Sequence, residues 1–170
     1  MITAHFSAGK VVSNSTAAFS LFEKSRFGEK VRGKVEYSLF EALYLLWKGK
    51  LELLQSKKVL SFDQFFLRAK RLDKRVSVKF PVFARLRDRG YVLKTALKFG
   101  ADFRVYKKGV RPGQDHALWV LFCVGESESH SWHEFAAKNR VAHSTRKKLL
   151  VGVVDDESDV TFFEVGWLKP

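Results

Sequence analysis

The apolar pattern of the chain changes at Gly90, and this change limits the possible folds more than any other feature. Before Gly90, residues 39–47, 62–72 and 80–88 carry apolar side chains at helical intervals. After Gly90, apolar runs are short and bounded by turn residues, which is typical of strands. These runs are Tyr91–Thr95, Phe103–Tyr106, Ala117–Val124, Leu149–Val154 and Val160–Val165. The pattern predicts an α/β (α+β) fold.

Capping signals support the first two helices. Ser38 precedes Glu41 by three residues, and Ser61 precedes Gln64 by three, which is the spacing of a capping box. The third helix is expected to hold Pro81 in its first turn, where proline is tolerated.

The rest of the chain allows a division into two domains. Residues 2–13 suggest a hairpin, residues 50–60 a strand or extended link, and residues 131–139 a helix. We place a small mixed N-terminal α/β domain at residues 1–76. Residues 77–170 form the second domain, with a mixed central sheet flanked by helices.

The charge of the chain indicates an anionic partner. Lys and Arg number 31 and Asp and Glu 18, which gives a net charge of +13. Cations on a folded chain favour nucleic acid first and an anionic membrane second, because both release counterions when neutralised. Basicity that serves only solubility stays open at this point.

No segment suggests insertion into a membrane or an oxidising compartment. Apolar runs such as residues 42–47 are far shorter than the roughly 20 residues of a membrane-spanning helix. The single cysteine, Cys123, lies in an apolar run and is expected to be buried and reduced. We expect a cytoplasmic protein without a membrane partner.

Three polar residues near predicted strand ends could cut RNA without a metal. They are Tyr106, His116 and Lys147. A base removes the proton of a ribose 2′-hydroxyl, an acid protonates the leaving 5′-oxygen, and a cation stabilises the developing charge. By residue type alone, a structural explanation is favoured, because a tyrosine at a strand end is usually an amphipathic rim residue and a lysine beside an arginine is usually solvated.

Longer sequence strings favour the catalytic role of these three residues over the structural one. They are YVLKTALKFGADFRVY (91–106), RVAHSTRKKLL (140–150), VVDD (153–156), DVTFF (159–163), WLKP (167–170) and, more faintly, SLFEALYL (38–45). Together with His116 they closely resemble the tRNA-splicing endonucleases of archaea, and the resemblance covers nearly the whole chain.

The resemblance implies a metal-independent and cofactor-free RNA endonuclease with a nuclease-like C-terminal domain. Its substrate is precursor tRNA with introns folded as a bulge-helix-bulge, and its products are 2′,3′-cyclic phosphate and 5′-hydroxyl ends. The family's triad maps to Tyr106 as base, His116 as acid and Lys147 as electrostatic stabiliser. The alternative is a non-catalytic structural or RNA-binding subunit, but such chains usually lack triad residues.

The resemblance also implies two further contacts. Arg140 matches a position that stacks on a bulged nucleotide. No second arginine aligns with the family's stacking partner, and the aromatic residues Phe162 and Trp167 are found near the end of the chain instead. An acidic loop inserts into a neighbouring subunit of a homotetramer or heterotetramer. The matching loop residues are Asp155, Asp156, Glu157 and Asp159, and Glu157 and Ser158 occupy a turn that holds glycine in many relatives.

Other chemistries lack a motif. His130 and His133 have no further ligands in a metal-binding pattern, so we predict no metal site. A metal-dependent DNA nuclease would need carboxylates beside Asp102, and the sequence does not provide them.

Overall fold

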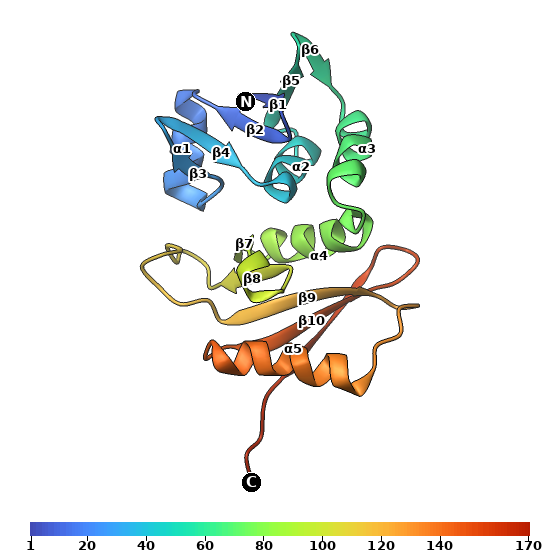
Figure 1. Ribbon diagram of the computed structural model, residues 1–170. Helices are drawn as coiled ribbons and strands as arrows, with labels where there is room; N and C mark the ends of the chain where they lie inside the picture. Colours follow the sequence, from blue (N-terminus) through green and yellow to red (C-terminus); the bar gives the residue numbers. More distant parts are fainter. The chain divides into compact units, whose positions relative to one another are not determined.

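Two separate β-sheets, one in each half of the chain, organise the fold in a computed structural model of residues 1–170. The sheets belong to two units, Met1–Phe80 and Pro81–Pro170 (Figure 1). The division expected between residues 76 and 77 lies in the first turn of helix α4 (Val76–Asp88), which contains the unit boundary. Each unit combines a mixed sheet with helices, so the predicted fold class is confirmed.

The N-terminal sheet has six strands in the order β3-β4-β2-β1-β5-β6. Strands β1 and β5 pair in parallel, and the other pairs are antiparallel. The bounds are β1 Ile2–Ser7, β2 Lys10–Ser13, β3 Glu29–Val31, β4 Lys34–Tyr37, β5 Leu51–Gln55 and β6 Lys58–Leu60. The hairpin predicted for residues 2–13 is confirmed, and residues 50–60 form a hairpin of their own.

Three helices complete this unit: α1 (Thr16–Ser25), α2 (Leu39–Trp47) and α3 (Phe62–Leu72). Both predicted capping boxes are present at α2 and α3. The Glu41 carboxylate also accepts a hydrogen bond from the Gly28 backbone N–H at 3.0 Å, so it ties α2 to the segment before β3. This second bond explains how a carboxylate that is 2% exposed is tolerated.

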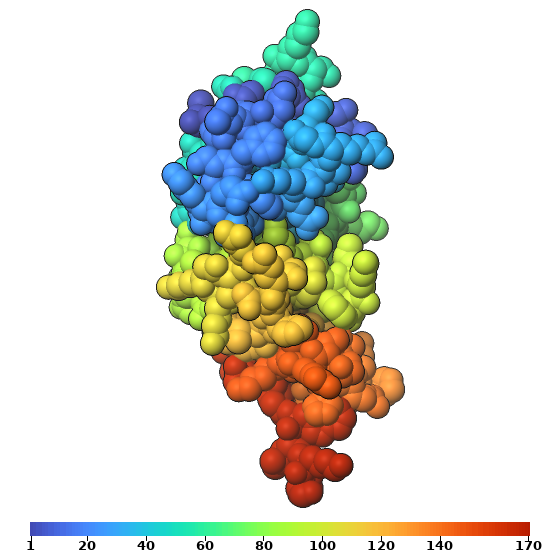
Figure 2. Space-filling model, turned by 90° about the vertical axis from the view of Figure 1, so that its left-hand side faces the viewer, coloured from blue at the N-terminus to red at the C-terminus, as the bar shows by residue number.

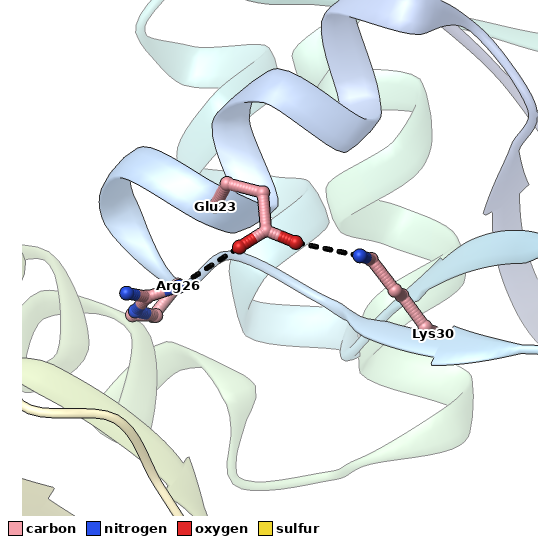
Figure 3. Close-up of polar contacts among 3 residues, drawn as sticks. All are labelled: Glu23, Arg26 and Lys30. Carbon is pink, nitrogen blue, oxygen red and sulfur yellow. Dashed lines mark hydrogen bonds and ion pairs between the residues drawn. The ribbon is translucent and has the colours of Figure 1, made fainter.

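An exposed charge cluster links α1 to the first residues after it. Glu23 pairs with Arg26 at 3.4 Å and with Lys30 at 2.5 Å (Figure 3). Arg26 ends the helix in a left-handed conformation, with φ of 58°. Because the Glu23 carboxylate and Lys30 are solvent-exposed, their pair stabilises the fold by less than about 1 kcal/mol.

The C-terminal sheet has five strands in the order β11-β10-β9-β8-β7. Strands β9 and β10 are parallel, and all other neighbours are antiparallel. The bounds are β7 Val92–Thr95, β8 Phe103–Tyr106, β9 Trp119–Gly125, β10 Lys148–Val154 and β11 Val160–Val165. All five predicted runs therefore lie in one sheet, as expected.

Helices cover this sheet on two faces (Figure 1). On one face, Phe83 of α4 packs on Phe103 with ring centroids 5.5 Å apart. A Cβ atom at Gly152 would lie 2.8 Å from the Val82 side chain, so α4 approaches β10 too closely for a larger residue. On the other face, helix α5 (Trp132–Ser144) contributes Ala142 to a cluster with Val120 and Leu149.

Two helices differ from their predicted bounds. Helix α4 begins at Val76, so Pro81 lies inside the helix and not in its first turn as predicted. The proline lacks an N–H, and the helix loses one backbone hydrogen bond there. Helix α5 extends five residues beyond the predicted end at Asn139, because the buried Ala142 packs on the sheet. Cys123 is fully buried, as predicted.

None of the helices combines the length and the apolar character that a membrane-spanning segment requires.

One buried hydroxyl gives a stability prediction. Tyr37 is 3% exposed, and its hydroxyl has no hydrogen-bond partner. Burial, followed by the charge of Glu41, raises the pKa of Tyr37 from 10.0 to about 12. The unfolded chain therefore ionises this phenol at a lower pH than the folded chain. Folding stability is fully present below pH 10 and decreases as the pH rises toward 12.

We expect Tyr37→Phe to stabilise the fold. The variant removes an unpaired buried polar group, whose burial costs about 1–3 kcal/mol of folding stability. It also removes the decrease in stability above pH 10. Thermal unfolding at pH 7 and pH 11 measures both effects, with Tyr91→Phe as the control at a half-buried tyrosine. A variant that is less stable than wild type at both pH values contradicts this account.

Candidate active site

The strand register brings three chain segments to one end of the C-terminal sheet. Val105 in β8 lies opposite Trp119 in β9, and Trp119 lies opposite Lys148 in β10. Tyr106 directly follows Val105, and Lys147 directly precedes Lys148. Because β8 runs antiparallel to β9 while β10 runs parallel to it, the end of β8 lies beside the starts of β9 and β10.

Tyr106 is a buried residue of this sheet end. Its exposure is 3%, and it packs against Val92, Ala117 and the partly buried Val110. Side chains alternate between sheet faces, so Tyr106 shares a face with Arg104. Arg104 lies opposite Val120, a member of the cluster beneath α5. Tyr106 therefore belongs to the α5 face of the sheet.

His116 lies in the loop between β8 and β9 and is exposed. The loop is fixed next to the sheet, because the Leu118 N–H donates to the Val105 carbonyl at 2.8 Å and Ala117 is buried beside Tyr106. The yellow atoms of residues 107–116 lie on the surface of the C-terminal unit (Figure 2). His116 thus sits one residue from a group that contacts Tyr106.

Lys147 is positioned by the end of α5. Its backbone N–H donates to the Ala142 carbonyl at 2.9 Å, and Arg146 before it adopts a left-handed φ of 55°. The Lys147 ammonium donates to the Thr145 carbonyl at 2.8 Å. Burial lowers the pKa of Lys147 below its ordinary value of 10.5, and the positive charge of Arg104 lowers it further.

An open cleft of about 800 Å³ adjoins Lys147 at this sheet end. It is lined by Ala117, Leu118, Trp119, His143, Ser144, Arg146, Lys147, Lys148 and Glu164. The cleft thus joins Lys147 to the residue after His116, whereas His116 and Tyr106 are not among its lining residues. Its cations and its openness suit a polyanion better than a small apolar ligand.

Two family models match the two halves of the chain. A family model described as tRNA intron endonuclease, catalytic C-terminal domain, matches residues 76–162, and one described as tRNA intron endonuclease, N-terminal domain, matches residues 2–66. The chain belongs to the tRNA intron endonuclease family. The catalytic-domain match covers the sheet end described above, so the chain is an enzyme, and the family identified from the sequence is confirmed.

Relatives with the name tRNA-splicing endonuclease match between 79% and 99% of this chain. The protein from Nanoarchaeum equitans (strain Kin4-M) is 50% identical over 141 residues, which cover 79% of this chain and 90% of its own. The protein from Thermococcus kodakarensis is 38% identical over 170 residues, 99% of each chain. That from Pyrococcus furiosus is 38% identical over 170 residues, 99% of this chain and 98% of its own.

Arg140 of this endonuclease family member lies on α5, one helical turn before the cleft residues His143 and Ser144, and does not itself line the cleft. It is exposed and lines a groove of about 380 Å³ together with Ala136, Asn139, Gly166, Trp167 and Leu168. Trp167 is 50% exposed and packs on His143, with ring centroids 4.2 Å apart. Phe162 lies elsewhere, under the Arg89 guanidinium at 6.0 Å. The groove therefore joins Arg140 to Trp167 and not to Phe162.

The four acidic residues form the turn between β10 and β11. The Asp155 carboxylate accepts hydrogen bonds from the N–H groups of Glu157 and Asp159, at 2.9 and 2.8 Å. Asp159 also pairs with Arg85 at 2.7 Å. Ser158 adopts the left-handed φ of 66°, the conformation that favours glycine. Asp156 and Glu157 remain exposed, and no cation of this chain pairs with them.

Sequence reasoning missed several residues beside the predicted site. The Glu164 carboxylate accepts hydrogen bonds from Trp119 and Lys148, both at 2.7 Å, and the Lys148 bond is the larger cause of its lowered pKa. Arg104 and Phe99 lie near Lys147. Both residues lie within the string 91–106 that carries the family resemblance, so the sequence did contain them. Only the pairing of the strands shows that they lie beside Lys147.

Proposed function

We propose that the chain cleaves precursor tRNA at bulge-helix-bulge junctions between exon and intron, without a metal or other cofactor. The observation that carries the proposal is the register of β8, β9 and β10, which brings the segments of Tyr106, His116 and Lys147 to one sheet end. Residues 77–170 then form the catalytic domain. A cytoplasmic location accords with such a substrate and stays a prediction.

The roles follow from the chemistry of RNA cleavage. Tyr106 accepts the proton of the 2′-hydroxyl while the 2′-oxygen attacks the adjacent phosphorus. The bond from phosphorus to the 5′-oxygen breaks, and His116 gives a proton to that oxygen. Lys147 stabilises the charge that develops on the phosphate oxygens. The products are a 2′,3′-cyclic phosphate and a 5′-hydroxyl.

Arg140 and Trp167 support recognition of a bulged base. A guanidinium and an indole are both flat groups, and both stack on nucleobases. Their shared groove makes Trp167, and not Phe162, the preferred second member of the clamp.

A second candidate is a non-catalytic structural subunit of a splicing endonuclease. The presence of a tyrosine, a histidine and a lysine at the matching positions favours the catalytic chain. Loop residues Asp155–Asp159 support assembly into a tetramer, either of identical chains or with a structural subunit.

Incubation of the purified chain with an intron-containing precursor tRNA in excess EDTA tests the proposal. We expect two cuts at the bulges, with cyclic phosphate and 5′-hydroxyl ends identified by end-specific labelling. An RNA with a 2′-deoxynucleotide before each cut lacks the nucleophile and should stay intact. Cleavage that requires an added divalent metal, or that leaves 5′-phosphate ends, contradicts the mechanism.

The same assay tests the clamp. Arg140→Ala should weaken cleavage of the bulged substrate, and Trp167→Leu should have the same effect, because each removes one side of the stack. Arg89→Gln serves as the control, since Arg89 stacks on Phe162 outside the groove. Equal cleavage by all three variants and wild type excludes the clamp.

A further inference from the structure

One aromatic ring near the candidate site carries two cations. The Phe99 ring centroid lies 5.8 Å from the Arg104 guanidinium carbon and 5.9 Å from the Lys147 ammonium nitrogen. Phe99 ends a short 3-10 helix (Leu97–Phe99) and packs against the apolar cluster on the α5 face of the sheet. We refer to Arg104, Phe99 and Lys147 as the Phe99 cation pair.

Neither cation is neutralised within the chain. The Arg104 Nε–H donates to the Thr95 carbonyl at 3.2 Å, and the Lys147 ammonium donates to the Thr145 carbonyl. Both partners are uncharged backbone groups, and no carboxylate pairs with either residue. The two Nη groups of Arg104 make no hydrogen bond to the protein, and its side chain is only half-buried. They are therefore available to a ligand.

Other charged groups around Lys147 do not supply the missing anion. Lys94 of β7 lies directly opposite Arg104 and adds positive charge. The one carboxylate that lines the cleft, Glu164, is bonded to Lys148 and Trp119. Asp102, two residues before Arg104, accepts a hydrogen bond from the Cys123 N–H. Tyr106 and His116 belong to the same sheet end, and His143 and Arg146 line the cleft.

Like charges held close together lower the stability of a fold, and such costs are concentrated at functional sites. The lowered pKa of Lys147 reports this repulsion, since Arg104 is one of its causes after burial. Adjacent phosphates of one RNA strand, one at each cation, would relieve this repulsion. A guanidinium with two free Nη groups fits a phosphate in bidentate fashion.

We propose that the Phe99 cation pair is a phosphodiester-binding site, in which Arg104 holds a phosphate of the RNA backbone next to the one that Lys147 contacts. The proposal rests on the proposed function for the identity of the RNA. Arg104 shares the α5 face with Tyr106, two positions away on β8, so the held phosphate would lie on the face of the candidate base. Arg104 then positions the substrate.

Binding of an uncleavable precursor tRNA, with 2′-deoxynucleotides before the cuts, tests the site directly. Fluorescence anisotropy at several salt concentrations gives the dissociation constant and its salt dependence. We expect Arg104→Gln to weaken binding and to reduce the slope of log K against log salt by about 1, as for one lost phosphate contact. Arg104→Lys, which keeps the charge, should retain the slope.

Arg89→Gln is the matched control. Arg89 also stacks on a phenylalanine, Phe162 at 6.0 Å, and its replacement removes the same charge from the same unit. We expect it to leave the slope unchanged. If Arg104→Gln retains the wild-type slope, or if Arg89→Gln loses as much as Arg104→Gln, the site is overturned.

The pH profile of single-turnover cleavage distinguishes phosphate binding beside Lys147 from a structural role. Arg104 lowers the pKa of Lys147, so its removal raises that pKa, and activity should persist to higher pH in Arg104→Gln than in wild type. If cleavage by Arg104→Gln declines at the same alkaline pH as cleavage by wild type, Arg104 does not act on Lys147. A wild-type chain that binds the RNA through Arg104 but does not cut it contradicts the proposed function and supports the site.

Discussion

Replacing His116 with alanine should slow cleavage of precursor tRNA by about 10²–10⁴-fold, the usual contribution of a general acid. RNA binding should stay within a few-fold of wild type, because His116 is one exposed side chain in a protein with a net charge of +13. Single-turnover cleavage and binding of the uncleavable RNA measure the two quantities separately. Equal losses in both would assign His116 to binding and not to proton transfer.

A substrate with sulfur in place of the leaving 5′-oxygen sharpens this test. A thiolate leaves without a proton, so the sulfur should restore most of the lost rate in His116→Ala. It should not restore the rate of Tyr106→Phe, because that variant lacks the base and not the acid. Tyr91→Phe is the control, since Tyr91 packs on Trp119 with ring centroids 5.5 Å apart at the same sheet end. Restoration of both variants, or of neither, contradicts the assigned roles.

Local signals predicted the elements that local chemistry determines. The Ser38 and Ser61 capping boxes each set the start of a helix, and the structure confirms both. Helix α1 was missed because its cap, Ser15, is followed at the third helical position by Ala18 and has no reciprocal partner. Strand β3 has three exposed residues and shows no alternation, while β4 alternates over only four residues, which is too short a run to identify a strand by itself.

Tertiary packing determines the elements that the sequence misjudged. Pro81 normally marks a helix start, but α4 continues through it while Val82 and Phe83 are buried against the sheet. Asn139 is a common helix end, but α5 continues so that Ala142 reaches its apolar cluster. In both cases the free energy of burial exceeds a local preference of about 1–3 kcal/mol.

The sequence predicted which segments form the candidate site, but it did not predict how these segments lie next to one another. Nothing in the runs around Trp119 and Lys148 specifies that they pair in parallel, yet this pairing brings Lys147 next to the loop of His116. The Phe99 cation pair depends on the same register. Its members are five residues apart and then 43 residues apart in sequence, so no motif spacing could reveal their contact.

The acidic loop is expected to control the oligomeric state. Two of its carboxylates form the turn, and the other two have no cation partner within the chain. Asp155 caps its own turn and Asp159 pairs with Arg85, so both are used within the chain. Asp156 and Glu157 have no cation partner and face solvent. If this loop joins subunits, these two carboxylates supply the charge that a basic groove of another chain accepts.

We therefore expect Asp156→Asn with Glu157→Gln to reduce the solution mass from a tetramer to a dimer, as measured by light scattering. Higher salt should shift the wild type in the same direction, since the Debye length shortens to roughly 3 Å at 1 M. The control, Glu29→Gln with Asp63→Asn, removes two exposed carboxylates from the N-terminal unit and should leave the mass unchanged. A tetramer that survives the loop substitutions contradicts this role, because the remaining two carboxylates are already paired within their own chain.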